Sequence, residues 1–377
     1  MAALLLPLQH GSGQAQSRPG RVPIPRVAGW DQSVFQPDLN SAEYIEAWSF
    51  RHDQPDLYLS ITFLISNLGP GQLNNGLAVL IYQGGQSHII TAEYSDHSLT
   101  ARPGDFGIKS GRSYFRSCGS DCLDVAIRLD QIHLDLQLSQ ILRGPDMDHP
   151  DLPLNAALRN NMQASIPIGR ARSVGQIRWQ RQELQLAGIG GLEYIHTHRS
   201  PHRYVKRIHL LRSLRGPEFY AGFLEPVSAK HTGAAAPGFG ISFGPLLPGM
   251  QLPQAAPGSL SASHSRGLLQ VPELRLELPQ VYYFTSVPYS SPGSDTSAVG
   301  ECRLAVTRQV YRGGMTVFGH ISAVLRWVLQ LLFANPVIVH FQATADWQCR
   351  ADKRSPWRTR QRFTDVLFTS YILDAEL

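Results

Sequence analysis

The sequence predicts an all-β fold of two consecutive antiparallel β-barrels with one C-terminal amphipathic helix. Gly and Pro are abundant, at 33 and 26 of 377 residues, which favours short strands joined by many turns. Apolar and polar residues alternate over many short segments, and a period of two residues is typical of strands with one buried face. These segments form two clusters, and a chain of this length usually exceeds one hydrophobic core.

The expected organisation has three parts. Residues 1–38 form an irregular lead-in that is rich in Gly, Pro and Gln. The first barrel is expected over residues 39–155 and the second over residues 156–377, because prolines and turn formers interrupt the strand pattern between 143 and 161. Closing each sheet into a barrel removes exposed edges and leaves an interior that can hold a small apolar ligand.

The strands of the first cluster follow from their alternation. In the last of them, Leu123, Val125, Ile127 and Leu129 alternate with residues such as Asp124, which predicts a long strand or a hairpin with one buried face. The expected strand segments of this cluster are 42–50, 57–66, 77–83, 88–95, 113–118 and 123–142.

The second cluster begins at residue 173, where apolar residues line one face around a turn near Gln182. One amphipathic helix is expected over His320–Phe333, and its apolar stripe is typical of core packing. Residues 230–267 have little regular pattern and much Gly and Pro, so we expect a long mobile loop and a candidate lid. The remaining expected strand segments are 273–287, 301–312, 336–349 and 358–373.

Charge and cysteine content limit the function classes. The net charge of +5 is spread along the chain without long Lys/Arg blocks, which argues against a nucleic-acid partner but allows contact of a basic face with a membrane surface. Four cysteines do not imply a disulfide scaffold in a chain of this length. Cys118 and Cys122 could be bridged in an oxidising compartment, but two ordinary thiols in a turn are the favoured expectation.

Targeting signals are weak. The N-terminal apolar run lacks a preceding basic residue and contains a proline, so it is a poor signal peptide. The most apolar segment, 321–341, is interrupted by Arg326, Asn335 and Pro336 and is not a clean membrane span. We therefore expect a soluble or peripheral membrane protein, with the cytoplasm favoured.

Gly190–Ser213 contains four histidines and five Lys/Arg residues around Glu193, and three interpretations of this stretch are possible. His196 and His198 share a strand face, as two ligands of one metal would, but a third ligand is missing and the nearby arginines repel cations, so no metal is expected. The basic residues could bind a phosphate or carboxylate, or form a solvated face. Tyr194 and His196 also share a face and form a candidate acid pair.

Two stretches resemble a known family. "AEYIEAWSFRHDQPDLYLSITFLISNLGPG" opens with an acid and aromatics, here Glu46, Trp48 and Phe50, and reaches Ser-Asn-Leu-Gly at 66–69. "IPIGRARSVGQIRWQRQELQLAGIGGLEYIHTHRS" and "LLFANPVIVHFQATADWQC" continue the likeness. The chain thus resembles the tandem lipocalin-like family of carotenoid 1,2-hydratase (hydroxyneurosporene synthase), the survival-factor proteins and certain fungal Diels–Alderases, over most of residues 40–375.

The resemblance implies a pair of lipocalin-like β-barrels with an apolar pocket between or within them. The family's hydratases add water across a terminal isoprenoid double bond without a cofactor, and use a Tyr-x-Asp strand as the acid. Tyr194 matches the tyrosine, whereas His196 occupies the Asp position and Thr197 that of the following His. Trp48, Trp179, His198 and Arg199 are the expected ligand-binding residues.

The histidine at the Asp position changes the expected chemistry. A neutral imidazole is a base, and burial beside basic residues lowers the pKa of a histidine further. The leading hypothesis is therefore a protein that binds an elongated apolar small molecule, isoprenoid or lipid-like. The alternative is a cofactor-free hydro-lyase or a Diels–Alderase-like cyclase, in which Tyr194 and His196 face the substrate. The sequence leaves conversion of the ligand and the oligomeric state open.

Overall fold

A computed structural model describes the protein over most of the two predicted barrels. Within the described residues every regular element is a strand except one short 3-10 helix, η1 (Asp96–Ser98), and all strand pairs are antiparallel. This confirms the predicted all-β class. The described residues are 33–38, 40–41, 43–67, 73–144, 162–198, 205–215, 219–226, 239–241, 260–264, 267–271, 274–286, 301–316, 337–350 and 354–373.

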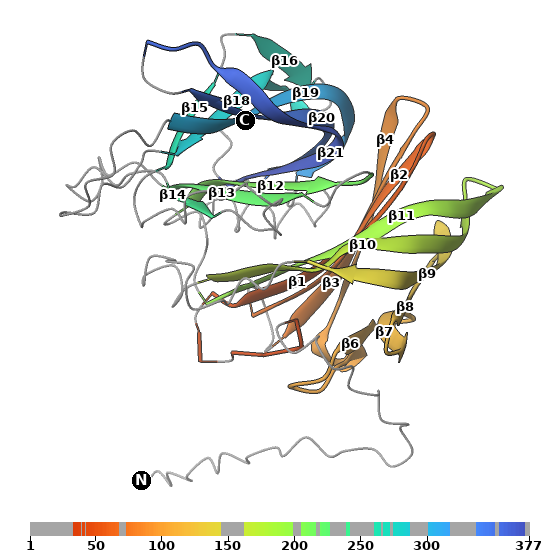
Figure 1. Cartoon of the computed structure of the whole chain (residues 1–377). Coiled ribbons are helices and arrows are strands. Elements are labelled where there is room, and N and C mark those ends of the chain that lie inside the picture. Colours follow the sequence, from red (N-terminus) through yellow and green to blue (C-terminus); the bar gives the residue numbers. More distant parts are fainter. Residues whose placement is uncertain are drawn as a thin grey trace, which may run out of the picture.

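The first sheet has eleven strands in the order β4-β3-β2-β1-β11-β10-β9-β8-β7-β6-β5. Contacts between β3 and β6 bring its two ends together, so the sheet curls into a nearly closed barrel (Figure 1). Its strands are β1 (Ile45–Gln54), β2 (Leu57–Ser66), β3 (Asn74–Gln83), β4 (Gln86–Tyr94), β5 (Leu99–Thr100), β6 (Gly107–Ser110), β7 (Ser113–Gly119), β8 (Cys122–Leu129), β9 (Ile132–Arg143), β10 (Met162–Trp179) and β11 (Gln182–Thr197).

Sheet membership differs from the boundary expected at residue 155. Strands β10 and β11 pair with β9 and β1, so the first sheet extends to Thr197. The prolines and turn formers after Arg143 lie in the connection between two neighbouring strands of one sheet. Such residues mark any break between strands, and they do not distinguish a hairpin connection from a domain linker.

The second sheet has eight strands in the order β14-β13-β12-β21-β20-β19-β18-β15, and contacts between β14 and β15 again bring its ends together. A separate hairpin joins β16 and β17. The strands are β12 (Val205–Ser213), β13 (Tyr220–Pro226), β14 (Phe239–Ile241), β15 (Leu260–His264), β16 (Leu268–Val271), β17 (Leu276–Pro279), β18 (Val281–Ser286), β19 (Glu301–Thr316), β20 (Val337–Arg350) and β21 (Arg358–Ile372).

Two expectations fall partly or wholly outside the described residues. The helix expected over His320–Phe333 lies outside them. Within the range 230–267, where a mobile loop was expected, Phe239–Ile241 and Leu260–His264 are strands of the second sheet, and residue 267 is also described. In both segments apolar residues alternate with other residues. The pattern is short and lies among many Gly and Pro residues, so it is hard to recognise in the sequence.

Two predicted hairpins are confirmed. The alternating run that starts at Leu123 forms β8 and β9, with the turn at residues 130–131. The turn expected near Gln182 lies at Gln180 and Arg181, whose φ angles are 50° and 63°. Positive φ at both central residues matches the right-handed twist of the flanking strands, so this turn sets the register of β10 against β11.

A cluster of aromatic rings lies inside the first barrel. Phe115 lies between the rings of Trp48, Phe50, Phe63 and Phe106, with centroid distances from 5.1 to 5.6 Å. Burying one such side chain stabilises a fold by about 1.5–3 kcal/mol. Trp48 and Phe50 of β1 therefore face an aromatic cluster inside the barrel.

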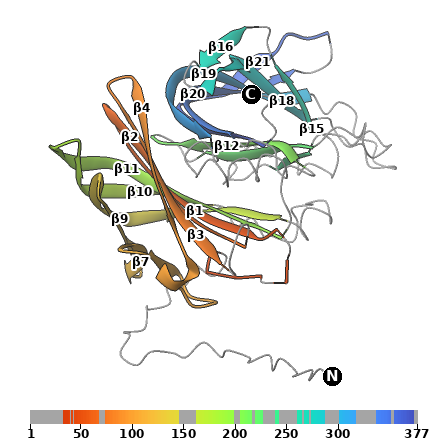
Figure 2. The same cartoon turned by 180° about the vertical axis from the view of Figure 1, so that it is seen from behind.

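The odd-numbered face of β1 points toward the second sheet. A small apolar cluster joins Tyr58 and Leu80 of the first sheet to Leu367 in β21 of the second sheet and to Leu214, which follows β12. The rings of Tyr58 and His340 also lie 5.3 Å apart across this contact. Figure 2 shows the second barrel seated against one side of the first.

The thiols expected at Cys118 and Cys122 form a disulfide, so this expectation was wrong. The β7–β8 turn brings their Cα atoms to 5.1 Å, within the range that a disulfide spans. Cys349 is also disulfide-bonded, and Cys302 lies opposite it in the β19–β20 register. Persistent disulfides are typical of oxidising compartments, so the bridges do not support the cytoplasmic location favoured by the sequence.

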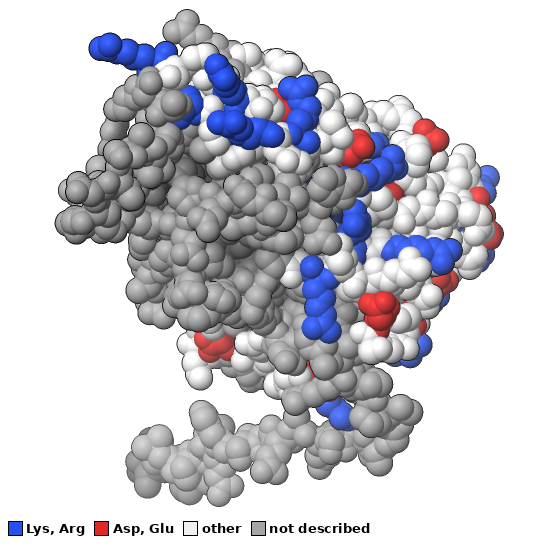
Figure 3. All heavy atoms as spheres, in the orientation of Figure 1, with Lys and Arg blue, Asp and Glu red and all other residues white. Residues whose placement is uncertain are grey.

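Positive charge is more concentrated than expected. Residues 350–362, around the β20–β21 turn, contain six Lys/Arg residues and one Asp, which equals the net charge of +5 of the whole chain. Trp357 lies between Arg303 and Arg350, whose guanidinium carbons are 4.2 and 4.5 Å from its ring. Figure 3 shows basic side chains in groups on the second barrel.

In the described part of the chain, helices long and apolar enough to cross a membrane are absent.

Candidate functional site

A buried carboxyl group, that of Glu46, forms the centre of the candidate site. The β1–β11 register places Glu46 opposite His196 and Trp48 opposite Tyr194. Residues that face each other across an antiparallel pair project to the same side, so the four side chains line the inner face of the first barrel. All four are at most 4% exposed, and the Glu46 residue is fully buried.

Three donors hold the Glu46 carboxyl group. The Tyr194 hydroxyl donates to Oε1 at 2.7 Å, and the Tyr44 hydroxyl donates to Oε2. The backbone N–H of Gln36 lies 3.2 Å from both carboxylate oxygens. Hydrogen bonds of this kind stabilise the charged carboxylate and therefore oppose the effect of burial on the pKa.

Burial is nevertheless the larger effect, and it raises the pKa of Glu46 to about 7. Burial also raises the pKa of Tyr44, so this hydroxyl stays protonated and donates. The pKa of His196 is lowered to about 4, first by burial and then by the neighbouring His198. At neutral pH the site therefore holds a carboxyl group poised between its acid and base forms, beside a neutral imidazole.

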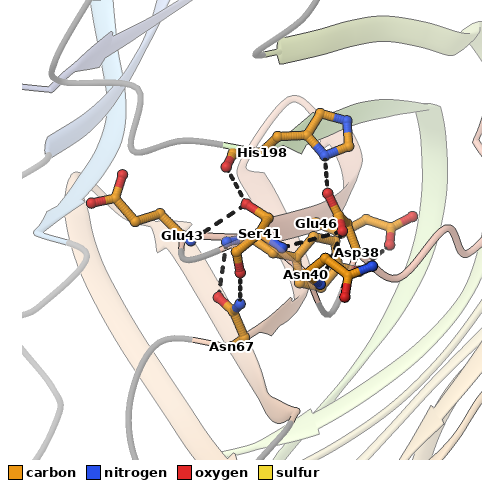
Figure 4. Close-up of polar contacts among 8 residues, drawn as sticks. Asp38, Asn40, Ser41, Glu43, Glu46, Asn67 and His198 are labelled. Atoms are coloured by element: carbon orange, nitrogen blue, oxygen red, sulfur yellow. Dashed lines mark hydrogen bonds and ion pairs between the residues drawn. The ribbon is translucent and has the colours of Figure 1, made fainter.

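His198 lies at the margin of the site, where Figure 4 shows it beside the segment that leads into β1. Its Nδ1 is 2.8 Å from Asp38 Oδ2, and its carbonyl oxygen accepts a hydrogen bond from the Ser41 hydroxyl. Its ring centroid is 4.5 Å from that of His196. The Nε2 atom of His196 is buried and has no hydrogen-bond partner among the described residues.

Residues 33–38 cover the site from the chain's N-terminal side. The Trp48 indole N–H donates to the Ser33 carbonyl oxygen at 2.7 Å, and the Val34 carbonyl oxygen lies 3.4 Å from the Tyr194 hydroxyl. The Phe35 N–H donates to the backbone carbonyl oxygen of Asp105 at 3.0 Å. The end of the expected lead-in is thus an ordered strap that is bonded to the barrel wall.

The structure brings together only some of the predicted site residues. Tyr194, His196 and Trp48 lie together, and His198 adjoins them. Trp179 lies at the β10–β11 turn, at the other end of β10, and its ring packs on His88 at 4.7 Å. Arg199 lies outside the described residues.

Sequence reasoning did not assign a role to Glu46. The signal was present, because Glu46 shares the alternating face of Trp48 and Phe50 in "EYIEAWSF". An acid on the buried face of a strand must be neutral or hydrogen-bonded, which marks it as a candidate functional group.

Removing a donor should shift the titration of Glu46. Because the Tyr194 hydroxyl stabilises the carboxylate, Tyr194→Phe is expected to raise the pKa of Glu46 above its value of about 7. ¹³C NMR of labelled glutamate carboxyl groups measures this pKa. Tyr82→Phe is the matched control, because Tyr82 packs on Tyr311 of the second sheet and makes no contact with Glu46. An unchanged or lower Glu46 pKa in Tyr194→Phe would show that this hydrogen bond does not act on the carboxylate.

A metal site is not built around the histidines in the described part of the chain. The group there whose ligand atoms lie close enough to hold an ion is Cys118, Cys122 and Asp124. Its two sulfur atoms are joined in the disulfide. A disulfide offers no thiolate ligand, so this group does not fit a metal.

Comparison with known proteins supports the fold. Protein-family models and curated proteins give no match to this sequence. Among solved structures, CghA superposes with a TM-score of 0.55 at 9% identity, over 94% of this chain and 95% of that one. A putative AttH (NE1406) from Nitrosomonas europaea gives 0.53 at 9% identity, over 96% and 100%.

A second CghA structure, with Sch210972, gives a TM-score of 0.51 at 9% identity, over 92% of this chain and 97% of that one. These likenesses span nearly the whole of both chains. They confirm the lipocalin-like two-barrel fold expected from the resemblance.

Proposed function

We propose that this protein binds an elongated apolar small molecule, isoprenoid or lipid-like, beside Glu46 and transfers a proton to it. The observation that carries the proposal is the buried Glu46 carboxyl group, which accepts hydrogen bonds from two tyrosines and has a pKa of about 7. A carboxylic acid that is partly protonated at neutral pH suits general acid catalysis. The aromatic rings around Trp48 suit an apolar ligand.

The proposed reaction needs no cofactor, because Glu46 gives up one proton and regains one. The Glu46 O–H bond breaks as a C–H bond forms at one end of a carbon–carbon double bond, which leaves a carbocation and a carboxylate. Water adds to the cation, and the proton it loses returns to Glu46. The hydroxyl groups of Tyr44 and Tyr194 stabilise the transient carboxylate.

Glu46 replaces the acid that His196 cannot provide. His196 stands where the resembling hydratases have Asp, and a histidine with a pKa of about 4 is a poor proton donor at neutral pH. Glu46 faces His196 across the β1–β11 pair, so its carboxyl group enters the same part of the barrel from the neighbouring strand. Neutral His196 then serves as a hydrogen-bonding group that orients water or ligand.

The test separates binding from conversion. Wild type, Glu46→Gln and Tyr194→Phe are incubated in D₂O with geranylgeraniol, which has several double bonds, or with its saturated analogue. Native mass spectrometry measures binding, and chromatography with mass detection measures the gain of one water. The exposed Glu183→Gln is the matched control for the same substitution.

We expect wild type and Glu183→Gln to bind and convert geranylgeraniol, and Glu46→Gln to bind it without conversion. If wild type binds both alcohols and converts neither, the protein is a carrier and the role of Glu46 as an acid is refuted. Absence of binding to either alcohol, and of any apolar molecule extracted from the purified protein, would refute the proposal as a whole.

A further inference from the structure

A second polar cluster lies on the opposite face of β1 and β11, between the two sheets. Arg51 Nη2 is 2.8 Å from Glu193 Oε2, and the Tyr371 hydroxyl of β21 donates to the same oxygen at 2.8 Å. The side chains of Arg51 and Glu193 are 1% and 2% exposed. This ion pair is therefore excluded from solvent and shared by both sheets.

A second guanidinium group, that of Arg212 on β12, is buried in the same contact. Arg212 is 2% exposed. Its Nη1 lies 1.9 Å from the position that a Cβ on Gly191 would occupy, so the guanidinium rests on the glycine backbone of β11. Within the described part of the chain, its Nε and Nη1 atoms are buried without a hydrogen-bond partner.

Two more groups of this cluster are unsatisfied. The Tyr58 hydroxyl and His340 Nε2 are buried and without hydrogen-bond partners among the described residues, and the two rings are 5.3 Å apart. His340 Nδ1 is 3.1 Å from Thr369 Oγ1, which leaves Nε2 to face the cluster. Both Tyr58 and His340 lie within the electrostatic reach of Arg51 and Arg212.

The charges around these groups do not balance. Arg51 and Arg212 face one carboxylate, that of Glu193. Asp53 interacts with Arg212, with Arg215, with Arg312 at 3.8 Å, and with the carboxylate of Asp365, so four arginines face three carboxylates in all. An uncompensated charge is costly in a site without solvent, and buried N–H groups almost always have acceptors.

We propose that Arg51, Arg212, Tyr58 and His340 bind the carboxylate group of a small apolar acid between the two sheets. Arg51 donates from Nη1 to Ser60 and from Nη2 to Glu193, so its remaining donor is Nε, whereas Arg212 offers both Nε and Nη1 to a carboxylate. One excess positive charge matches a monoanion. Leu80, Leu214 and Leu367 lie beside Tyr58 and suit a short apolar tail. The site uses the face of β1 opposite to Glu46, so it does not depend on the proposed function.

The experiment titrates the full chain with hexanoate, hexanol or inorganic phosphate at constant ionic strength, and measures affinity by calorimetry and the melting temperature by fluorimetry. Wild type is expected to bind hexanoate, with a rise in melting temperature, and to bind hexanol and phosphate at least about ten-fold more weakly. Arg212→Gln should weaken hexanoate binding by about ten-fold or more, and Arg212→Lys by less.

Glu46→Gln should retain the wild-type affinity for hexanoate, which separates this site from the one in the first barrel. If Arg212→Gln fails to fold, Tyr58→Phe provides the milder test, since it removes one donor and keeps the ring. Equal affinities of wild type and Arg212→Gln for hexanoate would overturn the proposal. Binding of hexanol as tight as that of hexanoate, or tighter binding of phosphate, would also overturn it.

Discussion

Glu193→Gln is expected to destabilise the protein by about 3–5 kcal/mol, because it leaves buried guanidinium groups without their counter-ion. The Glu193 carboxylate pairs with Arg51 at 2.8 Å and accepts a hydrogen bond from Tyr371. The nearby guanidinium of Arg51 holds the pKa of Glu193 below its usual value despite burial, so the group is charged at neutral pH. Urea unfolding at pH 7, followed by tryptophan fluorescence, measures the loss.

Two controls show whether the uncompensated charge is the cause. The double variant Arg51→Met/Glu193→Leu removes both charges and should be less destabilised than Glu193→Gln alone. Breaking an exposed pair by Arg112→Met, where Arg112 and Asp130 are 72% and 98% exposed, should cost less than about 1 kcal/mol. A Glu193→Gln variant as stable as wild type would mean that the buried guanidinium groups do not depend on the charge of Glu193.

The second large effect is a pH dependence of stability that Glu46 causes. The pKa of Glu46 is about 7 in the folded protein and 4.5 in its unperturbed state. The bound proton therefore stabilises the fold fully below pH 4.5, and this contribution is lost as the pH rises through 7. The shift corresponds to about 3 kcal/mol.

Glu46→Gln should remove that dependence. Between pH 4.5 and pH 8, wild type is expected to lose about 3 kcal/mol more unfolding free energy than the variant, since Gln does not titrate. Comparing the two proteins cancels the other titrating groups, which include Asp53. Parallel pH profiles of wild type and Glu46→Gln would contradict a raised pKa in the folded state.

Much of the fold could be predicted because its strands alternate. The segment 57–66 is the same in the prediction and in β2, and the run from Leu123 gives the β8–β9 hairpin. The boundary expected at residue 155 falls between two paired strands, because the connection after Arg143 joins neighbours in the first sheet. Strand pairing depends on partners that the local sequence does not specify. The Cys118–Cys122 bridge was missed because spacing alone does not give the geometry of a turn.

The candidate site was predicted in part for the same reason. Tyr194 and His196 share a face through strand periodicity, and the structure places them together. The carboxyl group that completes the site comes from β1, nearly 150 residues earlier, and Glu46 reaches Tyr194 only because β1 pairs with β11. Trp179, also expected at the site, lies at the far turn because of the length of β10.

The most direct test of the proposed function is the titration of the Glu46 carboxyl group itself. ¹³C NMR of the full chain labelled at glutamate side chains, with Glu46→Gln used to assign the resonance, follows its protonation from pH 4 to pH 9. The structure predicts a midpoint at about 7. A midpoint at or below 4.5, the unperturbed value, would show a fully ionised carboxylate at neutral pH and would contradict the account.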